Sequence, residues 1–102
     1  MNYTNLTRAT LYTLLSLSED YSYSSVWDGR GWRFMFANGY GVSLVKHSSS
    51  YGGTQDFWEL ALLRRESDGW SLYFGSYVTS YDVLGWLSEE DILEHVQNIL
   101  QL

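Results

Sequence analysis

The stretch WRFMFANGYGVSLVKHSSSYGGTQDFWELALL, residues 32–63, decides the fold. It contains three apolar runs. The first two are joined by Asn38-Gly39, and the last two are joined by a polar loop. Asn-Gly between β-prone segments is a strong hairpin signal, because a type I′ turn requires positive φ at both central residues. The pattern predicts two antiparallel strands at about residues 31–36 and 40–46.

A two-residue turn also sets the register of this hairpin. Phe36 is then expected opposite Gly41, and Met35 opposite Val42. In this register both faces of the hairpin are apolar, so at least one face must be covered by a helix. One face is predicted to carry Trp32, Phe34 and Phe36, and the other Arg33, Met35, Val42 and Leu44.

A second hairpin is predicted around Asp68-Gly69, between strands at about residues 57–64 and 70–74. Upstream, the side chains of residues 21–27 alternate, with Tyr21, Tyr23, Ser25 and Trp27 on one side and Ser22, Ser24 and Val26 on the other. These residues precede Asp28-Gly29, another I′-type signal, which makes them a candidate edge strand. Residues 75–87 lack clear periodicity, but they are apolar enough that we expect them to be covered.

Amphipathic patterns predict a helix at each end of the chain. Thr4 or Asn5 can cap the first helix, which we expect to end near Ser18. Ser88 is the expected N-cap of the second, with Asp91 in the position of a capping-box partner. The apolar stripe of this second helix consists of Ile92, Leu93, Val96, Ile99 and Leu100.

These elements predict one α+β domain spanning residues 1–102. It comprises an N-terminal helix, an antiparallel sheet of about four strands in two hairpins, and a C-terminal helix packed on the sheet. A chain of 102 residues can bury roughly 65% of its unfolded surface. No apolar run reaches the length of a membrane span, and cysteine is absent. We therefore expect a cytoplasmic protein without membrane contact or disulfides.

The formal net charge of −6 is concentrated at the C-terminus. Residues 1–80 hold seven acids and six bases, whereas residues 81–102 hold five acids and no base. Few Lys and Arg are available to neutralise phosphates, so direct nucleic-acid binding is disfavoured. The C-terminal acids either complement the start of a helix or mimic the phosphates of a nucleic acid. They are Asp82, Glu89, Glu90, Asp91 and Glu94.

Chemical motifs are weak, and we expect no enzyme activity, cofactor or metal. His47 adjoins a serine-rich loop, but no G-x-S-x-G turn presents a nucleophile. His95 has one carboxylate neighbour and no second histidine close in sequence. Glu59 lies inside an apolar strand, where we expect it to pair with Arg33, Lys46 or a serine. The alternative is a small enzyme or ligand-binding protein with a pocket near His47 and Glu59.

The aromatic content favours protein recognition. Nine Tyr and five Trp are accompanied by abundant Ser and Gly, a combination typical of binding surfaces. The rings outnumber what a core of this size can bury, so some tyrosines are expected at the surface. The predicted protein-binding residues are Ser49, Ser50, Tyr51, Gly52, Gly53, Tyr77 and Tyr81.

Four spaced blocks resemble a group of small bacteriophage-encoded proteins. They are FANGYGVS from residue 36, HSSSYGG from 47, WELA from 58 and DVLGWLSEEDI from 82. The resemblance implies a phage accessory protein in the host cytoplasm. Such a protein binds and inhibits a host protein, such as a defence nuclease (anti-CRISPR or anti-restriction type) or a transcription complex. A structural virion role is the other alternative, and the oligomeric state is left open, with a homodimer as one option.

Overall fold

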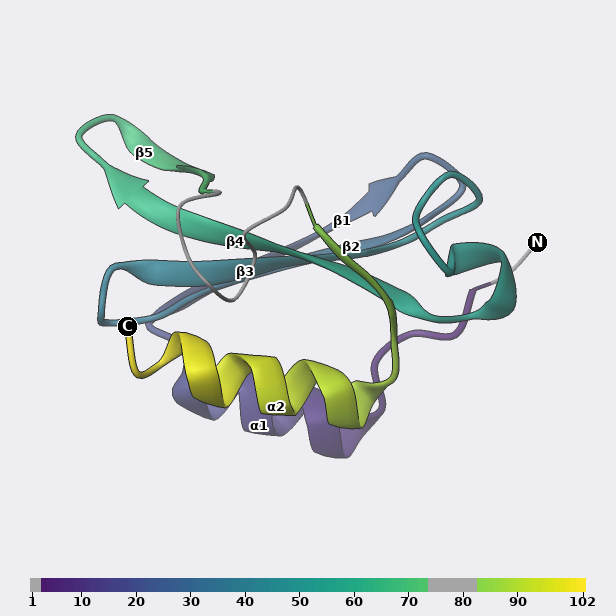
Figure 1. Cartoon of the computed structure of the whole chain (residues 1–102), viewed down its shortest axis with the longest axis horizontal. Coiled ribbons are helices and arrows are strands. Elements are labelled where there is room, and N and C mark those ends of the chain that lie inside the picture. Colours follow the sequence, from purple (N-terminus) through teal and green to yellow (C-terminus); the bar gives the residue numbers. More distant parts are fainter. Residues whose placement is uncertain (1–2, 74–82) are drawn as a thin grey trace.

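The computed structural model of the chain describes residues 3–73 and 83–102, which form two layers (Figure 1). One layer is an antiparallel sheet in the order β1-β2-β3-β4-β5. Strand β6 pairs with the same edge of β4 as β5 does, but at the other end of β4. The other layer holds both helices. The elements are α1 (Arg8–Leu17), β1 (Asp20–Val26), β2 (Gly29–Met35), β3 (Tyr40–Lys46), η1 (Gly53–Gln55), β4 (Trp58–Glu66), β5 (Gly69–Leu72), β6 (Leu84–Leu87) and α2 (Glu89–Ile99).

The α+β class, with a helix at each end of the sheet, is confirmed, but the sheet is larger than predicted. Six strands lie in the described part of the chain, instead of four. The candidate edge strand exists as β1. The additional strand β6 was not predicted, because its four residues include Gly85 and do not alternate between apolar and polar side chains.

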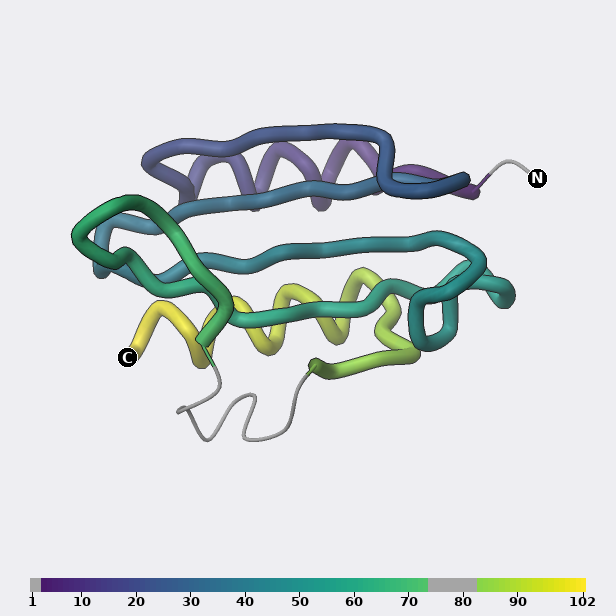
Figure 2. Tube along the Cα trace, turned by 90° about the horizontal axis from the view of Figure 1, so that it is seen from above, coloured from purple at the N-terminus to yellow at the C-terminus, as the bar shows by residue number. Residues whose placement is uncertain are grey.

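Both helices cover the same face of the sheet (Figures 1 and 2). Alternate residues of β2, β3 and β4 point to that face, and apolar side chains of the helices close the core against them. Its fully buried members include Phe34, Phe36, Val42, Leu44, Trp58, Leu60, Leu62, Ile92, Val96 and Ile99.

The predicted register of the first hairpin is wrong by one residue. Met35 lies opposite Gly41 instead of Val42, and the Phe36 N–H donates to the Tyr40 carbonyl. The loop therefore has three residues, and only Gly39 among them has positive φ, at 86°. This is the type I turn followed by a left-handed glycine, in place of the type I′ turn.

The Asn38 side chain explains the longer loop. Its Oδ1 accepts from the Tyr40 N–H at 3.1 Å, and its Nδ2 donates to the Ile99 carbonyl at 3.0 Å. A contact with the end of α2 thus fixes the turn. Because a slip of one residue exchanges the two faces of a strand, Val42 and Leu44 lie with Trp32 and Phe34 in the core, not with Met35.

Helix α1 begins later than predicted, with Thr7 as its N-cap instead of Thr4 or Asn5. The preceding residues have no regular secondary structure and bind the sheet. The Tyr3 carbonyl accepts from Arg30 Nε at 2.7 Å, and Asn5 Oδ1 accepts from Trp32 Nε1 at 2.8 Å. The C-terminal helix is as predicted, with the full capping box between Ser88 and Asp91. Neither helix is long and apolar enough to span a membrane.

We predict that Ser88→Ala lowers the free energy of unfolding by about 1 kcal/mol, because it removes the hydroxyl that accepts from the Asp91 N–H. Urea titration should show a lower midpoint with an unchanged slope. Ser88→Thr keeps the acceptor and is the control. Equal losses in both variants would contradict a role for the hydroxyl.

Candidate interaction surface

Three exposed rings, two from the β3–β4 loop and one from β6, lie together at one end of the sheet. We name Tyr51, Phe57 and Trp86 the aromatic surface. Their exposed fractions are 64%, 37% and 55%. The Phe57 and Trp86 ring centroids are 6.2 Å apart, and a Cβ added to Gly52 would come within 3.1 Å of both residues. The β3–β4 loop thus meets β6 in one aromatic patch.

Trp86 is turned outward by a bulge in β6. Trp58 and Leu60 of β4, two positions apart, pair with Leu87 and Leu84, which are three positions apart. The extra residue leaves Trp86 with φ of 59°, a conformation that costs a side-chain-bearing residue energy. The Trp86 N–H donates to the Tyr51 carbonyl at 3.1 Å, which joins the bulge to the loop. Our expectation that residues 75–87 are covered is therefore wrong for Trp86.

Glu59 holds Tyr51 from the other side. Its Oε1 accepts from the Tyr51 N–H at 3.0 Å, so its partner is this backbone group and not Arg33, Lys46 or a serine. Tyr51 also lies against Gly85, where an added Cβ would come within 2.4 Å of the Tyr51 Cβ. Only glycine permits this approach, and the Tyr51 backbone is consequently held between Glu59 of β4 and Gly85 of β6.

A buried lysine fixes the end of the same loop. The Lys46 side chain is 3% exposed, and its Nζ donates to the Thr4 carbonyl at 2.9 Å and to Asp56 Oδ1 at 3.1 Å. The ammonium also lies 4.5 Å from the Trp58 ring centroid. Partial burial disfavours the charged carboxylate, but hydrogen bonds from Thr4 and Lys46 outweigh it and lower the pKa of Asp56.

Trp27 extends this end of the molecule at the tip of the β1–β2 hairpin. It is 83% exposed and has φ of 57°, so the turn falls on Trp27-Asp28 and not on the predicted Asp28-Gly29. Its ring centroid lies 6.2 Å from that of His47. The Ser48 N–H donates to Asp28 Oδ1 at 3.0 Å and joins the hairpin to the loop. This hydrogen bond is the main cause of the lowered pKa of Asp28.

The structure separates the predicted loop residues into two kinds. Tyr51 and Ser49 are exposed, whereas Ser50, Gly52 and Gly53 are buried and shape the loop. The Ser50 hydroxyl donates to the His47 carbonyl and accepts from the His47 N–H. The remaining predicted residues, Tyr77, Tyr81 and the acid Asp82, lie outside the described residues.

The acids of α2 are likewise of two kinds, those with hydrogen-bond partners and those that are exposed. Glu89 accepts from the Thr7 N–H at 3.0 Å and from the Thr7 hydroxyl at 2.6 Å, which joins the two helices. Burial opposes ionisation of Glu89, but these bonds and one from Thr10 prevail and lower its pKa. Asp91 belongs to the capping box, and the Ser88 N–H is the main cause of its lowered pKa. Glu90 and Glu94 are exposed.

His47 and Glu59 each accept a hydrogen bond from a backbone N–H of the β3–β4 loop. The His47 Nδ1 accepts from the Ser49 N–H at 3.1 Å, and the Glu59 carboxylate is occupied by Tyr51. Within residues 3–73 and 83–102, no group of three His, Asp or Glu side chains could hold a metal ion. The cavity found in this part of the chain lies on the sheet and is lined by neither His47 nor Glu59.

Sequence analysis identified Tyr51 but not Trp27, Phe57 or Trp86. Gly85 before Trp86 was a usable signal, since glycine in a strand often marks a bulge. Comparison with known proteins adds no assignment: no family model, curated protein or solved structure matches the chain. The function is therefore argued from geometry.

We predict that acid weakens the fold through Asp56 and Glu89. Because their pKa values are lower in the folded chain, their stabilisation is full above the unfolded value of about 4 and is lost as pH falls through the folded value. Thermal unfolding from pH 7 to pH 2 should show Asp56→Asn less stable at pH 7 and equal to wild type at the lowest pH. The control is Asp68→Asn in the β4–β5 turn. Curves that stay parallel at all pH values would refute the role of Asp56.

We also predict that Trp27→Gly raises the free energy of unfolding by about 1 kcal/mol, because glycine adopts positive φ without strain and the indole is 83% exposed. Chemical denaturation measures the change. Trp27→Ala removes the same ring while retaining Cβ, and it should not give this gain. A loss of stability in the glycine variant would show that the indole contributes more than its conformation costs.

Proposed function

We propose that the chain is a non-enzymatic protein-binding module and that the aromatic surface is its contact site. The observation that carries the proposal is Trp86, which is half-exposed and held at positive φ beside the exposed Tyr51. Backbone strain of this kind persists only where the surrounding structure imposes it, and it is concentrated at functional sites.

The energetics of Trp86 support this proposal. An exposed indole forgoes the stabilisation that burial of an aromatic side chain provides, and a non-glycine residue at positive φ costs about 1–2 kcal/mol. The fold therefore carries two unfavourable features at one residue. A bound protein that covers the indole would recover the stabilisation that the exposed ring forgoes. Tryptophan and tyrosine are also among the residues that most often dominate binding energy.

The surface is also pre-organised. Tyr51 is held through its N–H by Glu59 and through its carbonyl by Trp86, and Phe57 is flanked by Asp56 and Trp58, which are both tied to Lys46. A loop whose backbone is fixed before binding loses less conformational entropy on contact. Rigid aromatic anchors among Ser and Gly are typical of protein-recognition loops.

Charge near the surface favours a partner with an apolar patch and a basic rim. The acids near the aromatic surface are Asp28 of the hairpin tip, Asp56 of the loop and Glu59 of β4, and the neighbouring Lys46 is buried and paired with Asp56. A surface of this sign repels phosphates, which disfavours nucleic acid as the ligand. If the chain is phage-encoded, as its resemblance implies, the partner is a host protein, and binding would inhibit or modulate it.

We predict that an immobilised chain retains a specific protein from bacterial lysate and that Trp86→Gly and Tyr51→Ala each reduce the retained amount at least about tenfold, the scale of a binding hot spot. Quantitative mass spectrometry measures retention. Trp86→Gly removes the ring without leaving a strained side chain, so lost binding would not reflect unfolding.

Tyr12→Ala is the matched control, because Tyr12 is 61% exposed but lies on α1. Its retention should equal that of wild type. The purified partner should then bind more weakly as salt increases, since the rims are oppositely charged. Equal retention by all four proteins, or no specific protein at all, would refute the proposal.

A further inference from the structure

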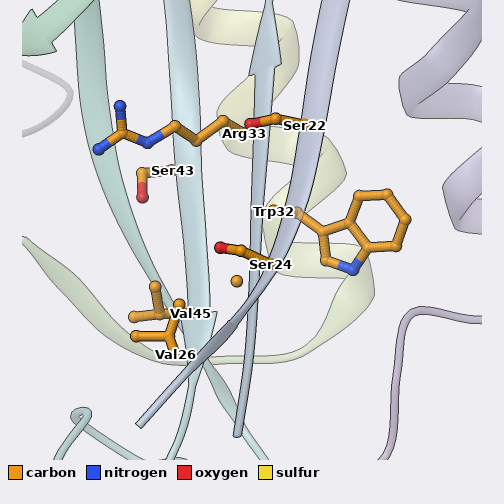
Figure 3. A pocket seen from close by; sticks show the side chains of 8 residues that line it. Ser22, Ser24, Val26, Trp32, Arg33, Ser43 and Val45 are labelled. Carbon is orange, nitrogen blue, oxygen red and sulfur yellow. The ribbon is translucent and has the colours of Figure 1, made fainter.

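The face of the sheet opposite the helices contains a cavity of about 410 Å³, within the range of roughly 300–1,000 Å³ common for small-molecule sites (Figure 3). It lies over β1, β2 and β3, and no residue of the aromatic surface is among its lining residues. The side chains that define it are Ser22, Ser24, Ser43, Arg33, Val26 and Val45.

The strand register places a polar group at one end of this cavity. Arg33 of β2 lies opposite Ser22 of β1 and opposite Ser43 of β3, so one cation is flanked by two hydroxyls in a single row across the sheet. Ser24 adds a third hydroxyl one row further along. In Figure 3 these four side chains lie on the same side of the sheet.

The other end of the cavity is apolar. Val26 and Val45 lie side by side there, as Figure 3 shows. Gly31, between Ser24 and Val45 in the next row, contributes no side chain, and the Val26 side chain lies over its backbone. Trp32 lines the cavity too, but its ring is directed to the opposite side of the sheet. The cavity is therefore amphipathic along its length.

Among the described residues, Arg33 differs from most other cations in having no partner. Lys46, Arg64 and Arg65 form ion pairs, and Arg30 donates to Tyr3 and Tyr23. In the described part of the chain the structure gives Arg33 neither a hydrogen bond nor an ion pair. Glu59, the acid that lies opposite Val45 on β4, is bound to the Tyr51 N–H.

We propose that this cavity binds a small organic anion. Its oxyanion would accept hydrogen bonds from the Arg33 guanidinium and the serine hydroxyls, and its apolar substituent would lie on Val26 and Val45. A guanidinium provides paired donors that match a carboxylate or a phosphate, so both groups share the required chemistry. The site is separate from the aromatic surface and does not depend on the protein-binding proposal.

The test is a titration of the ¹⁵N-labelled full chain at constant ionic strength, followed by amide chemical shifts. Hexanoate should give saturable shifts at Ser22, Arg33 and Ser43. It should bind at least about fourfold more tightly than butyrate, since each fully buried methylene contributes roughly fourfold. Arg33→Gln should weaken hexanoate binding about tenfold or more, because it removes a charged hydrogen-bond donor.

Matched variants and probes separate the two ends of the cavity. Val45→Thr should reduce the preference for hexanoate over butyrate while leaving butyrate binding unchanged. Arg8→Gln, which removes the unpaired arginine of α1, should change nothing. Inorganic phosphate that binds more tightly than butyrate would assign the oxyanion to a phosphate ester, and the reverse order would assign it to a carboxylate.

Three outcomes would overturn the proposal. The first is the absence of saturable shifts with any of the anions. The second is equal binding by Arg33→Gln and wild type. The third is equal binding of 1-hexanol, which has the apolar chain without the charge.

Discussion

The buried ammonium of Lys46 is the interaction on which the arrangement of this end of the molecule depends. A charged group that is 3% exposed must find acceptors inside the protein, and it finds them in the Thr4 carbonyl and the Asp56 carboxylate. These acceptors belong to the segment before α1 and to the end of the β3–β4 loop. Neither segment can move without leaving the charge unpaired, which is far more costly than the net gain from forming the pair. The ammonium thus fixes the position of Phe57.

The sequence was sufficient where the signals were local. Ser88 and Asp91 lie three residues apart and define the start of α2 by themselves. The second hairpin was also predicted from local signals, although its turn falls on Ser67-Asp68 and not on Asp68-Gly69, because Gly69 pairs with Glu66. The first turn could not be predicted in the same way. Its length depends on a bond from Asn38 to Ile99, 61 positions away, and this bond competes with the intrinsic preference of Asn-Gly. The one-residue error then exchanged the faces of Val42 and Leu44.

The candidate site was predicted only in part, for a related reason. Tyr51 was accessible to composition arguments because it lies in a loop of Ser and Gly. Trp86 is exposed because β6 contains a bulge, and the bulge is defined only by its pairing with β4. Likewise, Glu59 was expected to pair across the sheet, but the adjacent loop folds back and presents the Tyr51 N–H to its carboxylate. Side-chain partners that depend on loop geometry are not encoded in strand alternation.

The distribution of charge differs between the two surfaces. Near the aromatic surface Asp28 and Glu59 are acidic, and Lys46 and Asp56 neutralise each other inside the fold. On the open face of the sheet the side chains lining the cavity are serines, valines and Arg33, with Glu59 opposite Val45 and Asp20 opposite Met35. The net charge of −6 therefore does not describe either site. Local pairing decides the field that a ligand meets over a few ångströms, because the effect of distant exposed charges is screened by salt. The chain thus places acids beside the surface proposed to contact a protein and Arg33 beside the cavity proposed to bind an anion.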